Sequence, residues 1–565
     1  EVNMKIQRIG ALASFLAAAV AKEIKPDLQR GAELYDSGIM HEHLMSLKMD
    51  HWAAEKAAGL MNSSVWPRLN YTKCIDGKAE AIPGDPLHTF KCKNADLYDF
   101  LPHSAIGSPI GNADGEVGSS AWGWTDEESG REFIAAGLFQ GASFIEILPT
   151  GKMRHVGFLP SFGTLSENSL WREIRGYKHY MLIGSEQNGH GVQIFDMKKL
   201  LDITDEQAPR QFAQSEVTGH FTELPIGATH NVLSNEELEY GVAVGARPRT
   251  DACKSGLIFF DLKDPSNPKK LGCHADDGYV HDAQCLVYRG PDKRYEGRDI
   301  CYGYNEDTLT IYDVTDKTKT NIISRTGYEG SSYTHQGWVL DKNNQEYLLM
   351  DDEYDEYDGI AGPGQDGFAA TYIWDIKDLE NPKQTGVYKA SVRGIDHNQY
   401  VVDGYSYQSN YINGFRVYDV SSIPSDPTGA GVCETAFFDI YPEDDSAPGG
   451  GVLQFSGSWA SYAYFKSGYI FINTIERGAF VVKLTKKERC NNKATCNADN
   501  CLRAMRSTSV AGRLEESQQF CGEFTKTHVY DVSVVPEFAS KACGENVISR
   551  VSSACNCLPT PTPAA

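Results

Sequence analysis

The sequence predicts an all-β fold: a seven-bladed β-propeller closed by an N-terminal strand, with a small helical N-terminal segment and a disulfide-rich C-terminal module. A strand pattern that ends on aromatic–Asp–apolar recurs at intervals of about 40–60 residues, and each interval carries four short strand signals. These units show no helical periodicity, which favours a propeller over a helical solenoid. The clearest copies are "VQIFDM" (192–197), "LIFFDL" (257–262), "LTIYDV" (309–314), "TYIWDI" (371–376) and "FRVYDV" (415–420).

Two weaker copies and one displaced strand complete the predicted ring. "GASFIEIL" (141–148) and "GAFVVKL" (478–484) raise the number of units to seven, so we expect the propeller to span 95–487. The last unit lacks a fourth strand after Leu484, whereas "LYDFLPHS" (97–104) resembles the end of the first unit. We therefore expect 97–104 to complete the seventh blade, because closure removes exposed sheet edges.

The first residues of the chain are typical of a secretory signal peptide. Within 4–21, Lys5 and Arg8 form a basic start, an apolar run follows, and "AVA" provides a cleavage site. A buried amphipathic helix is the alternative, but the run lacks helical polar positions. If the chain is exported, Asn62 and Asn70 lie in glycosylation motifs.

The N-terminal segment 22–94 is predicted to be largely helical over 26–70. Met40, Leu44 and Leu47 follow one another at i, i+4 and i+7, the spacing of one helix face. "HEHLMSLKMDH" adds three histidines to this helix, which we interpret as an exposed polar face.

The 14 cysteines favour an oxidising, extracellular destination. Seven of them lie within the predicted module 488–557, and no pair has zinc-ribbon spacing, so disulfides are expected. We predict a bond between Cys285 and Cys301 and bonds largely within the module, with Cys433 as the partner of its odd cysteine. A Pro/Thr tail (558–565) follows, and it cannot form a core.

Charge and hydropathy argue against nucleic acid binding and against a transmembrane segment. The net charge is −23 and no Lys/Arg-rich block occurs, which argues against nucleic acid. Apart from the predicted signal peptide, no apolar stretch approaches the ~18 residues of a membrane span, so we expect no transmembrane segment. The composition indicates a secreted, extracellular protein.

Four histidines occupy one position in consecutive units. His230, His281, His335 and His397 stand where the first strand of units three to six begins, 51, 54 and 62 residues apart. The first strand of each blade lines the central channel, so these side chains should meet at one channel mouth. We predict that they bind a divalent metal: zinc, manganese or copper by ligand type, or calcium if carboxylates dominate. The alternative is that they hydrogen-bond the turns between blades.

The ends of the second strands add charge to this mouth, and the remaining units add tryptophan. Carboxylates beside imidazoles suit a metal, whereas indole faces beside arginine suit sugars or uronic acids. Packing between blades is the alternative for the tryptophans. The predicted catalytic residues are His281, His335, Glu306 and Arg477, and the predicted substrate contacts are Arg172, Arg247, Trp171, Trp459 and Glu353.

Several motifs resemble those of a known family. "YTHQGW", "IDHNQY", "YPEDDSA" and "IERGAF", which occur in this order within residues 90–484, resemble the choice-of-anchor B proteins, secreted or surface chains with LVIVD-type propeller repeats. The resemblance implies a propeller in an extracellular setting and no particular reaction. The C-terminal region "CNADNCLRAM…SSACNCLP" resembles cysteine-rich modules of secreted proteins from filamentous fungi, so we expect release rather than surface anchoring.

Two functions follow from these observations. The first is a metal-assisted lyase or hydrolase that acts on an extracellular polysaccharide or cell-wall glycan, with the metal stabilising developing negative charge. The second is a non-catalytic binding or adhesion protein that uses the same channel mouth. The sequence does not indicate an oligomeric state.

Overall fold

A computed structural model describes residues 22–111, 117–490, 500–507, 509–524, 532–544 and 547–558. The predicted signal peptide (4–21) and, except for its first residue, the Pro/Thr tail (558–565) lie outside these residues. The chain divides into two compact units, a large one that spans Ala21–Cys490 and a small one that contains the helices after Asn491.

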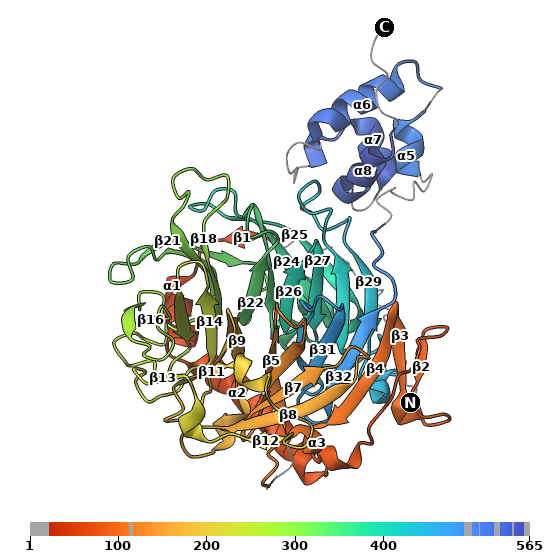
Figure 1. Ribbon diagram of the computed structural model, residues 1–565. Helices are drawn as coiled ribbons and strands as arrows, with labels where there is room; N and C mark the ends of the chain where they lie inside the picture. The colour runs from red at the N-terminus through yellow and green to blue at the C-terminus, as the bar shows by residue number, and fades with distance from the viewer. Residues whose placement is uncertain are drawn as a thin grey trace, which may run out of the picture. The chain divides into compact units, whose positions relative to one another are not determined.

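The large unit is a seven-bladed β-propeller, as predicted (Figure 1). Neighbouring strands within each blade run antiparallel. Blade 1 contains β5 (Gly118–Thr125), β6 (Glu132–Leu138), β7 (Gly141–Ile147) and β8 (Met153–Pro160). Blade 2 contains β9 (Ile174–Tyr177), β10 (Tyr180–Ile183), β11 (Val192–Asp196) and β13 (Gly219–Phe221). Blade 3 contains β14 (Asn231–Asn235), β15 (Tyr240–Val244), β16 (Leu257–Asp261) and β17 (Lys270–His274).

The other four blades follow in chain order. Blade 4 contains β18 (Asp282–Val287), β19 (Asp299–Tyr304), β20 (Leu309–Asp313) and β21 (Asn321–Tyr328). Blade 5 contains β22 (Thr334–Val339), β23 (Tyr347–Asp352), β24 (Phe368–Asp375) and β25 (Lys383–Arg393). Blade 6 contains β26 (Asn398–Val402), β27 (Tyr405–Ser409), β28 (Phe415–Asp419) and β29 (Cys433–Phe438). Blade 7 contains β30 (Ser458–Tyr462), β31 (Tyr469–Thr474), β32 (Gly478–Leu484) and β4 (Ala95–Pro102).

The N-terminal strand β4 closes the ring, as the sequence predicts. It pairs antiparallel with β32, from Gly478 opposite Pro102 to Leu484 opposite Ala95. Four short strands extend other blades: β1 (Glu23–Ile24) on β21, β12 (Arg210–Gln211) on β8, β3 (Thr89–Lys93) on β29, and β2 (Lys78–Glu80) on β3.

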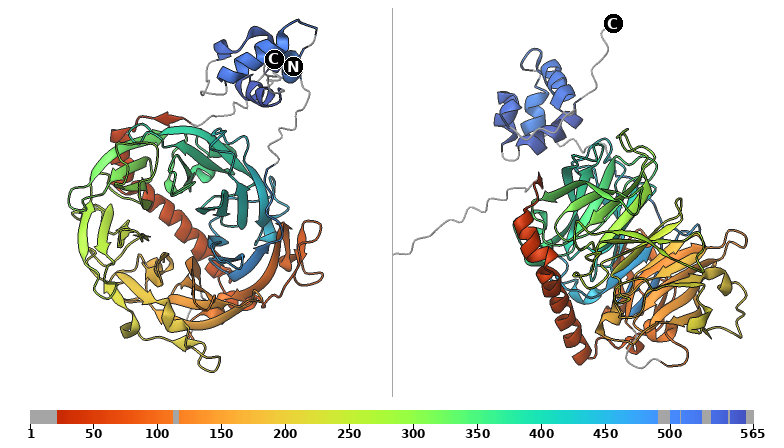
Figure 2. Two further views of the ribbon diagram at one scale, coloured as in Figure 1. Left: turned by 45° about the horizontal axis from the view of Figure 1, so that its top comes forward. Right: turned by 90° about the vertical axis from the view of Figure 1, so that its left-hand side faces the viewer.

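One long helix lies on one face of the propeller. The helical residues comprise α1 (Leu28–Arg30), a π-helical turn (Gly31–Asp36) and α2 (Ile39–Ala57). Figure 2 shows α2 running across the ring. Leu44 and Trp52 of α2 are buried. Shorter helices are η2 (Ser63–Val65), η3 (Pro86–His88), α3 (His103–Ile106), η4 (Glu167–Leu170), η5 (Met197–Leu200), η6 (Gln214–Glu216), α4 (Asp355–Asp358), η7 (Pro363–Asp366) and η8 (Pro442–Asp444).

The small unit is helical and disulfide-bonded, which confirms the predicted disulfide-rich module. Cys501–Cys543 and Cys521–Cys555 tie helices together, and Leu502 lies in the small core that these helices enclose. The helices are α5 (Asn500–Met505), α6 (Arg513–Phe524), η9 (Val532–Val534), α7 (Glu537–Cys543) and α8 (Val547–Asn556).

Disulfides also cross-link residues of the propeller unit. The predicted pair Cys285–Cys301 joins the neighbouring strands β18 and β19, and Cys433 is bonded to Cys490, as expected for the odd cysteine. Cys74–Cys92 and Cys253–Cys273 complete the set in this unit. This use of disulfides is consistent with an extracellular protein. Within the described residues, the structure contains no helix with the length and apolar character needed to span a bilayer.

Candidate metal site beneath a helix

Four imidazoles converge at one end of the propeller channel. His230, His281 and His397 immediately precede β14, β18 and β26, and His335 is the second residue of β22. These are the first strands of four consecutive blades, so their starts meet at one mouth. Successive ring centroids lie 4.1, 4.4 and 4.6 Å apart. We call this row the imidazole arc; all four members are buried.

The Nδ1 atoms of the arc are occupied by protein partners. Nδ1 of His281 lies 3.0 Å from the His335 carbonyl oxygen, and Nδ1 of His397 lies 2.7 Å from that of Trp459. A carbonyl oxygen only accepts, so Nδ1 carries the proton in both rings and Nε2 keeps a lone pair. Metal-binding histidines are usually oriented in this way, with the second nitrogen fixed by the protein.

The other two imidazoles have carboxylates as Nδ1 partners. Nδ1 of His335 lies 3.0 Å from Asp351 Oδ1, and Nδ1 of His230 lies 2.5 Å from Glu186 Oε1. Burial raises the pKa of Asp351 well above its ordinary value, although the hydrogen bonds that Asp351 accepts from two N–H groups oppose this rise. A carboxylate on Nδ1 raises the basicity of a ligating imidazole.

Glu353 brings a carboxylate to the arc. It follows β23, and its Oε1 lies 2.6 Å from Lys48 Nζ and 3.6 Å from His397 Nε2. The hydroxyl of Tyr411 also donates to Oε1. Oε2 is buried and has no hydrogen-bond partner among the described residues. An unpaired buried carboxylate oxygen is costly unless a cation or donor occupies the space beside it.

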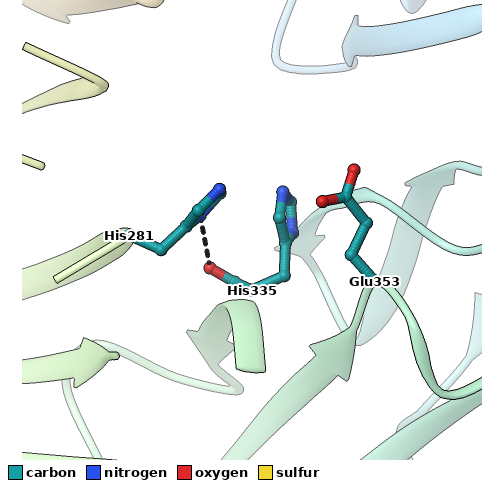
Figure 3. Close-up of side chains that lie close together, drawn as sticks. All are labelled: His281, His335 and Glu353. Atoms are coloured by element: carbon teal, nitrogen blue, oxygen red, sulfur yellow. Dashed lines mark hydrogen bonds between the residues drawn. The ribbon is translucent and has the colours of Figure 1, made fainter. Parts of the chain in front are cut away.

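His281, His335 and Glu353 form the one group of three or more His, Cys, Asp or Glu side chains in the described chain that could hold a metal ion (Figure 3). Their ligand atoms lie within 4.8 Å of one another. A tetrahedral ion with bonds of about 2.0–2.2 Å separates its ligands by roughly 3.4 Å, so these side chains would move together by about 1 Å. The structure therefore unites two of the four predicted histidine ligands with a glutamate predicted to contact substrate.

The electrostatics of the group suit a cation. Burial lowers the pKa of His335 to about 4 and that of His281 well below its ordinary value, so both rings are neutral. Burial alone would raise the pKa of Glu353, but the Lys48 ammonium lowers it overall. The group thus offers two neutral nitrogen donors and one anionic oxygen donor.

Helix α2 covers the arc. Lys48 reaches Glu353, and the Trp52 indole donates to the Phe455 carbonyl oxygen at 2.7 Å. The histidines of α2 also contact the propeller: Nδ1 of His41 lies 2.6 Å from Tyr333 Oη, Nε2 of His43 lies 3.2 Å from Tyr354 Oη, and Nε2 of His51 lies 2.6 Å from Ser456 Oγ. The interpretation of these histidines as an exposed polar face is therefore wrong for His41 and His51, which are half-buried.

The predicted acidic and basic residues have protein partners. Glu306 forms a two-pronged ion pair with Arg249, with N–O distances of 2.6 and 3.0 Å. The fully buried Arg172 donates to the Leu138 carbonyl oxygen at 2.9 Å, and its Nη1 lies 2.8 Å from Nε2 of His190. Arg477 pairs with Glu443 at 2.7 Å, and Arg247 donates to the Glu186 carbonyl oxygen.

The two predicted tryptophan contacts lie beneath α2. Trp171 and Trp459 are each 2% exposed. The Trp52 ring centroid lies 5.4 Å from that of Trp171 and 6.5 Å from that of Trp459. Trp459 Nε1 donates to Glu173 at 2.7 Å. These rings pack in the channel mouth beneath α2. While α2 covers the mouth, the two tryptophans are packing residues, which was the alternative to substrate contact.

Sequence reasoning missed Lys48, Asp351, Tyr411 and Arg249. A signal for Lys48 is present, because it stands four residues from both Leu44 and Trp52 and thus on their helix face. Asp351 immediately precedes a carboxylate pair at the end of a second strand. Tyr411 and Arg249 lie in loops, where the sequence carries no periodic pattern.

No family model and no curated protein matches the chain. Among solved structures, the C-terminal WD40 domain of Sif2 is 12% identical with a TM-score of 0.39, covering 74% of this chain and 97% of that one. The computationally designed Ika8 protein is 10% identical with a TM-score of 0.39, covering 74% of this chain and 95% of its own. The seven-bladed fold rests on the sheets described above, not on these similarities.

Proposed function

We propose that this protein is a secreted β-propeller that binds one divalent transition metal through His281, His335 and Glu353. The observation that carries the proposal is the grouping of Glu353, whose buried Oε2 has no hydrogen-bond partner among the described residues, with two imidazoles whose Nδ1 atoms are already engaged. Two histidines and one glutamate also form the ligand set of several catalytic zinc sites, which keep a fourth position open. This donor set suits zinc, copper or manganese better than calcium, which prefers oxygen ligands.

We further propose that the metal assists a lyase or hydrolase reaction on an extracellular acidic glycan. A bound ion would stabilise negative charge that develops on a substrate oxygen. His230 lies next to His281 and is paired with Glu186, so it is placed to act as a base. Because α2 covers the arc, the substrate would reach the ion only after α2 moves away.

A non-catalytic binding or adhesion role is the second candidate, and α2 is the observation that favours it. Lys48 already supplies one positive charge to Glu353, and the apolar side of α2 fills the mouth. In that case Lys48 and the apolar side of α2 would keep the helix on the propeller, and ligands would bind elsewhere. Membership of the choice-of-anchor B family, proposed from the sequence motifs, is compatible with either role.

Metal analysis tests the proposal directly. Protein purified without chelator or affinity metal should contain about one equivalent of a transition metal by elemental analysis. The double variant His281→Ala/His335→Ala should lose the metal and stay folded. A matched control, His155→Ala/His179→Ala, removes two histidines outside the arc and should keep the metal.

Two results would contradict metal binding. One is native protein without metal that also binds none when zinc, manganese or copper is added. The other is a His281→Ala/His335→Ala variant that is less stable than the native protein but still contains about one equivalent of metal. The two histidines would then be structural. If metal binding is found, uronate polysaccharides should be assayed for unsaturated products and new reducing ends, with Glu353→Gln as the inactive control.

A further inference from the structure

The propeller channel has a second, open end. A cavity of about 1260 Å³ is lined by residues that close the inner strands, including Asn235 of β14, Val287 of β18, Val339 of β22 and Val402 of β26. The imidazole arc lies at the starts of these same strands, so the cavity lies at the end opposite α2. Its volume exceeds the roughly 300–1,000 Å³ of most small-molecule pockets, which leaves room for an oligomeric ligand.

A buried guanidinium lies at the inner end of this cavity. Arg175 of β9 is 5% exposed and lines the cavity. Its guanidinium carbon lies 4.9 Å from the ring centroid of Trp122 and 5.1 Å from that of Tyr400. The guanidinium forms an ion pair with Asp282, with 3.6 Å between Nη2 and Oδ2, and Nη1 donates to the Ile174 carbonyl oxygen at 3.4 Å. Nη2 has no hydrogen-bond partner among the described residues. A buried Nη2 group that lacks a hydrogen-bond acceptor favours a ligand with an anionic oxygen.

A second donor faces the same space. Gln284 of β18 lines the cavity, and its Oε1 accepts a hydrogen bond from the Val339 N–H at 3.0 Å. That bond fixes the orientation of the amide, because only the oxygen accepts. The Nε2 hydrogens of Gln284 have no acceptor in the part of the chain that the structure describes. Arg175 and Gln284 therefore both present N–H donors to this cavity.

Aromatic rings form the walls beside these donors. Trp122, Trp338 and Tyr464 line the cavity and are half-buried, so part of each ring is accessible. Such rings present flat apolar area together with a polar edge, which suits the faces of sugar rings. The outer lining is charged with both signs, for example in the Arg289–Glu237 pair at 2.6 Å. A polar rim around aromatic walls fits a carbohydrate better than a lipid.

We propose that this cavity binds an acidic carbohydrate, with one uronate carboxylate on Arg175 and Gln284 and the sugar rings against Trp122 and Trp338. The site lies at the far end of the channel from the imidazole arc and shares no residue with it. Binding requires neither a metal nor a movement of α2. The metal proposal and this proposal can therefore fail separately.

Calorimetric titration of the full chain with a tetramer of galacturonate tests the site, and a neutral galactose tetramer serves as the reference ligand. We expect saturable binding of the acidic tetramer, at least tenfold tighter than that of the neutral one. Arg175→Gln should weaken it at least tenfold, whereas Arg210→Gln, which removes a guanidinium outside the cavity, should leave it unchanged. Binding should persist in EDTA and in the His281→Ala/His335→Ala variant.

Two further variants cover the case in which Arg175→Gln does not fold. Gln284→Glu keeps the acceptor for Val339 but replaces the donor with a negative charge, so it should weaken binding of the acidic tetramer at least tenfold. Trp338→Ala should weaken binding of both tetramers. The proposal is overturned if the acidic tetramer does not bind, if it binds no tighter than the neutral one, or if folded Arg175→Gln or Gln284→Glu binds it as the native protein does.

Discussion

One aspartate at the same position in five blades explains why the repeat is visible in the sequence. In the aromatic–Asp–apolar motif, the Asp stands at the end of the third strand, and its carboxylate accepts the N–H of the residue two positions later. This bond starts the turn to the fourth strand. It occurs from Asp196, Asp261, Asp313, Asp375 and Asp419, with lengths between 2.9 and 3.1 Å. The motif is thus a local requirement of each blade.

Buried aspartates with other roles should make stability depend on pH. Asp439 is 3% exposed, and burial raises its pKa to about 7 although Arg416 opposes the rise. A folded pKa above the unfolded value of about 3.9 means that the folded state binds the proton more tightly. The stabilising contribution is complete below about pH 4 and is lost as pH rises through 7.

We therefore expect the melting temperature to fall between pH 5 and pH 8. Asp439→Asn should flatten this dependence, because an amide stays neutral; the difference is on the order of 1–4 kcal/mol. Thermal unfolding over this range checks it, with the exposed Asp264→Asn as a control. Identical pH dependence in native protein and Asp439→Asn would show that Asp439 is not the group responsible.

Repetition made part of the site predictable. The convergence of His230, His281, His335 and His397 follows from their equal positions in successive blades, which the sequence displays. The choice of Glu353 as a ligand could not be predicted, because it depends on which carboxylate oxygen remains unpaired after Lys48 and Tyr411 have bound the other. Such a detail is set by contacts between residues far apart in the chain.

At the scale of elements, α2 shows the limit of periodic patterns. The spacing of Met40, Leu44 and Leu47 predicts a helix, and the helix forms. Its buried side also contains Lys48 and Glu55, whose partners lie in the propeller. Because these buried charges break the apolar stripe, the sequence gives no sign that α2 lies against the channel mouth.

Replacing Lys48 should make the stability of the protein depend on metal. In Lys48→Met, Glu353 is left as a buried carboxylate without its ammonium partner, which typically costs about 3–5 kcal/mol. A divalent ion bound by Glu353 and the two imidazoles would replace that charge. We expect a lower melting temperature in EDTA and recovery with zinc, measured by differential scanning calorimetry.

The double variant Lys48→Met/Glu353→Gln is the matched control for this prediction. It removes both charges, so it should recover much of the stability in EDTA and gain nothing from zinc. Equal destabilisation of Lys48→Met with and without metal would contradict binding at Glu353.

For the whole molecule, the seven units and the closing strand were predictable because both rest on repeated strand patterns. The added strands β1, β2 and β3 were not, since they are two to five residues long and belong to no repeat. The open cavity was also hidden from the sequence. It forms where the ends of several inner strands meet, and these ends share no motif comparable to the histidines.

Ring closure predicts that blade 7 opens only when the propeller unfolds. The strand β4 reaches blade 7 from the other end of the domain, and Phe100 packs on Phe480 with ring centroids 4.5 Å apart. Separating β4 from β32 would expose two sheet edges and this apolar contact, so local opening should be unfavourable. By hydrogen exchange, peptides covering 95–102 and 478–484 should exchange together, as slowly as β19.

Phe100→Ala, which deletes a buried ring at a typical cost of about 3–5 kcal/mol, should speed exchange across the propeller, whereas the exposed Leu28→Ala should not. Fast exchange of 95–102 alone would show that the N-terminal strand adds to a ring that is already stable without it.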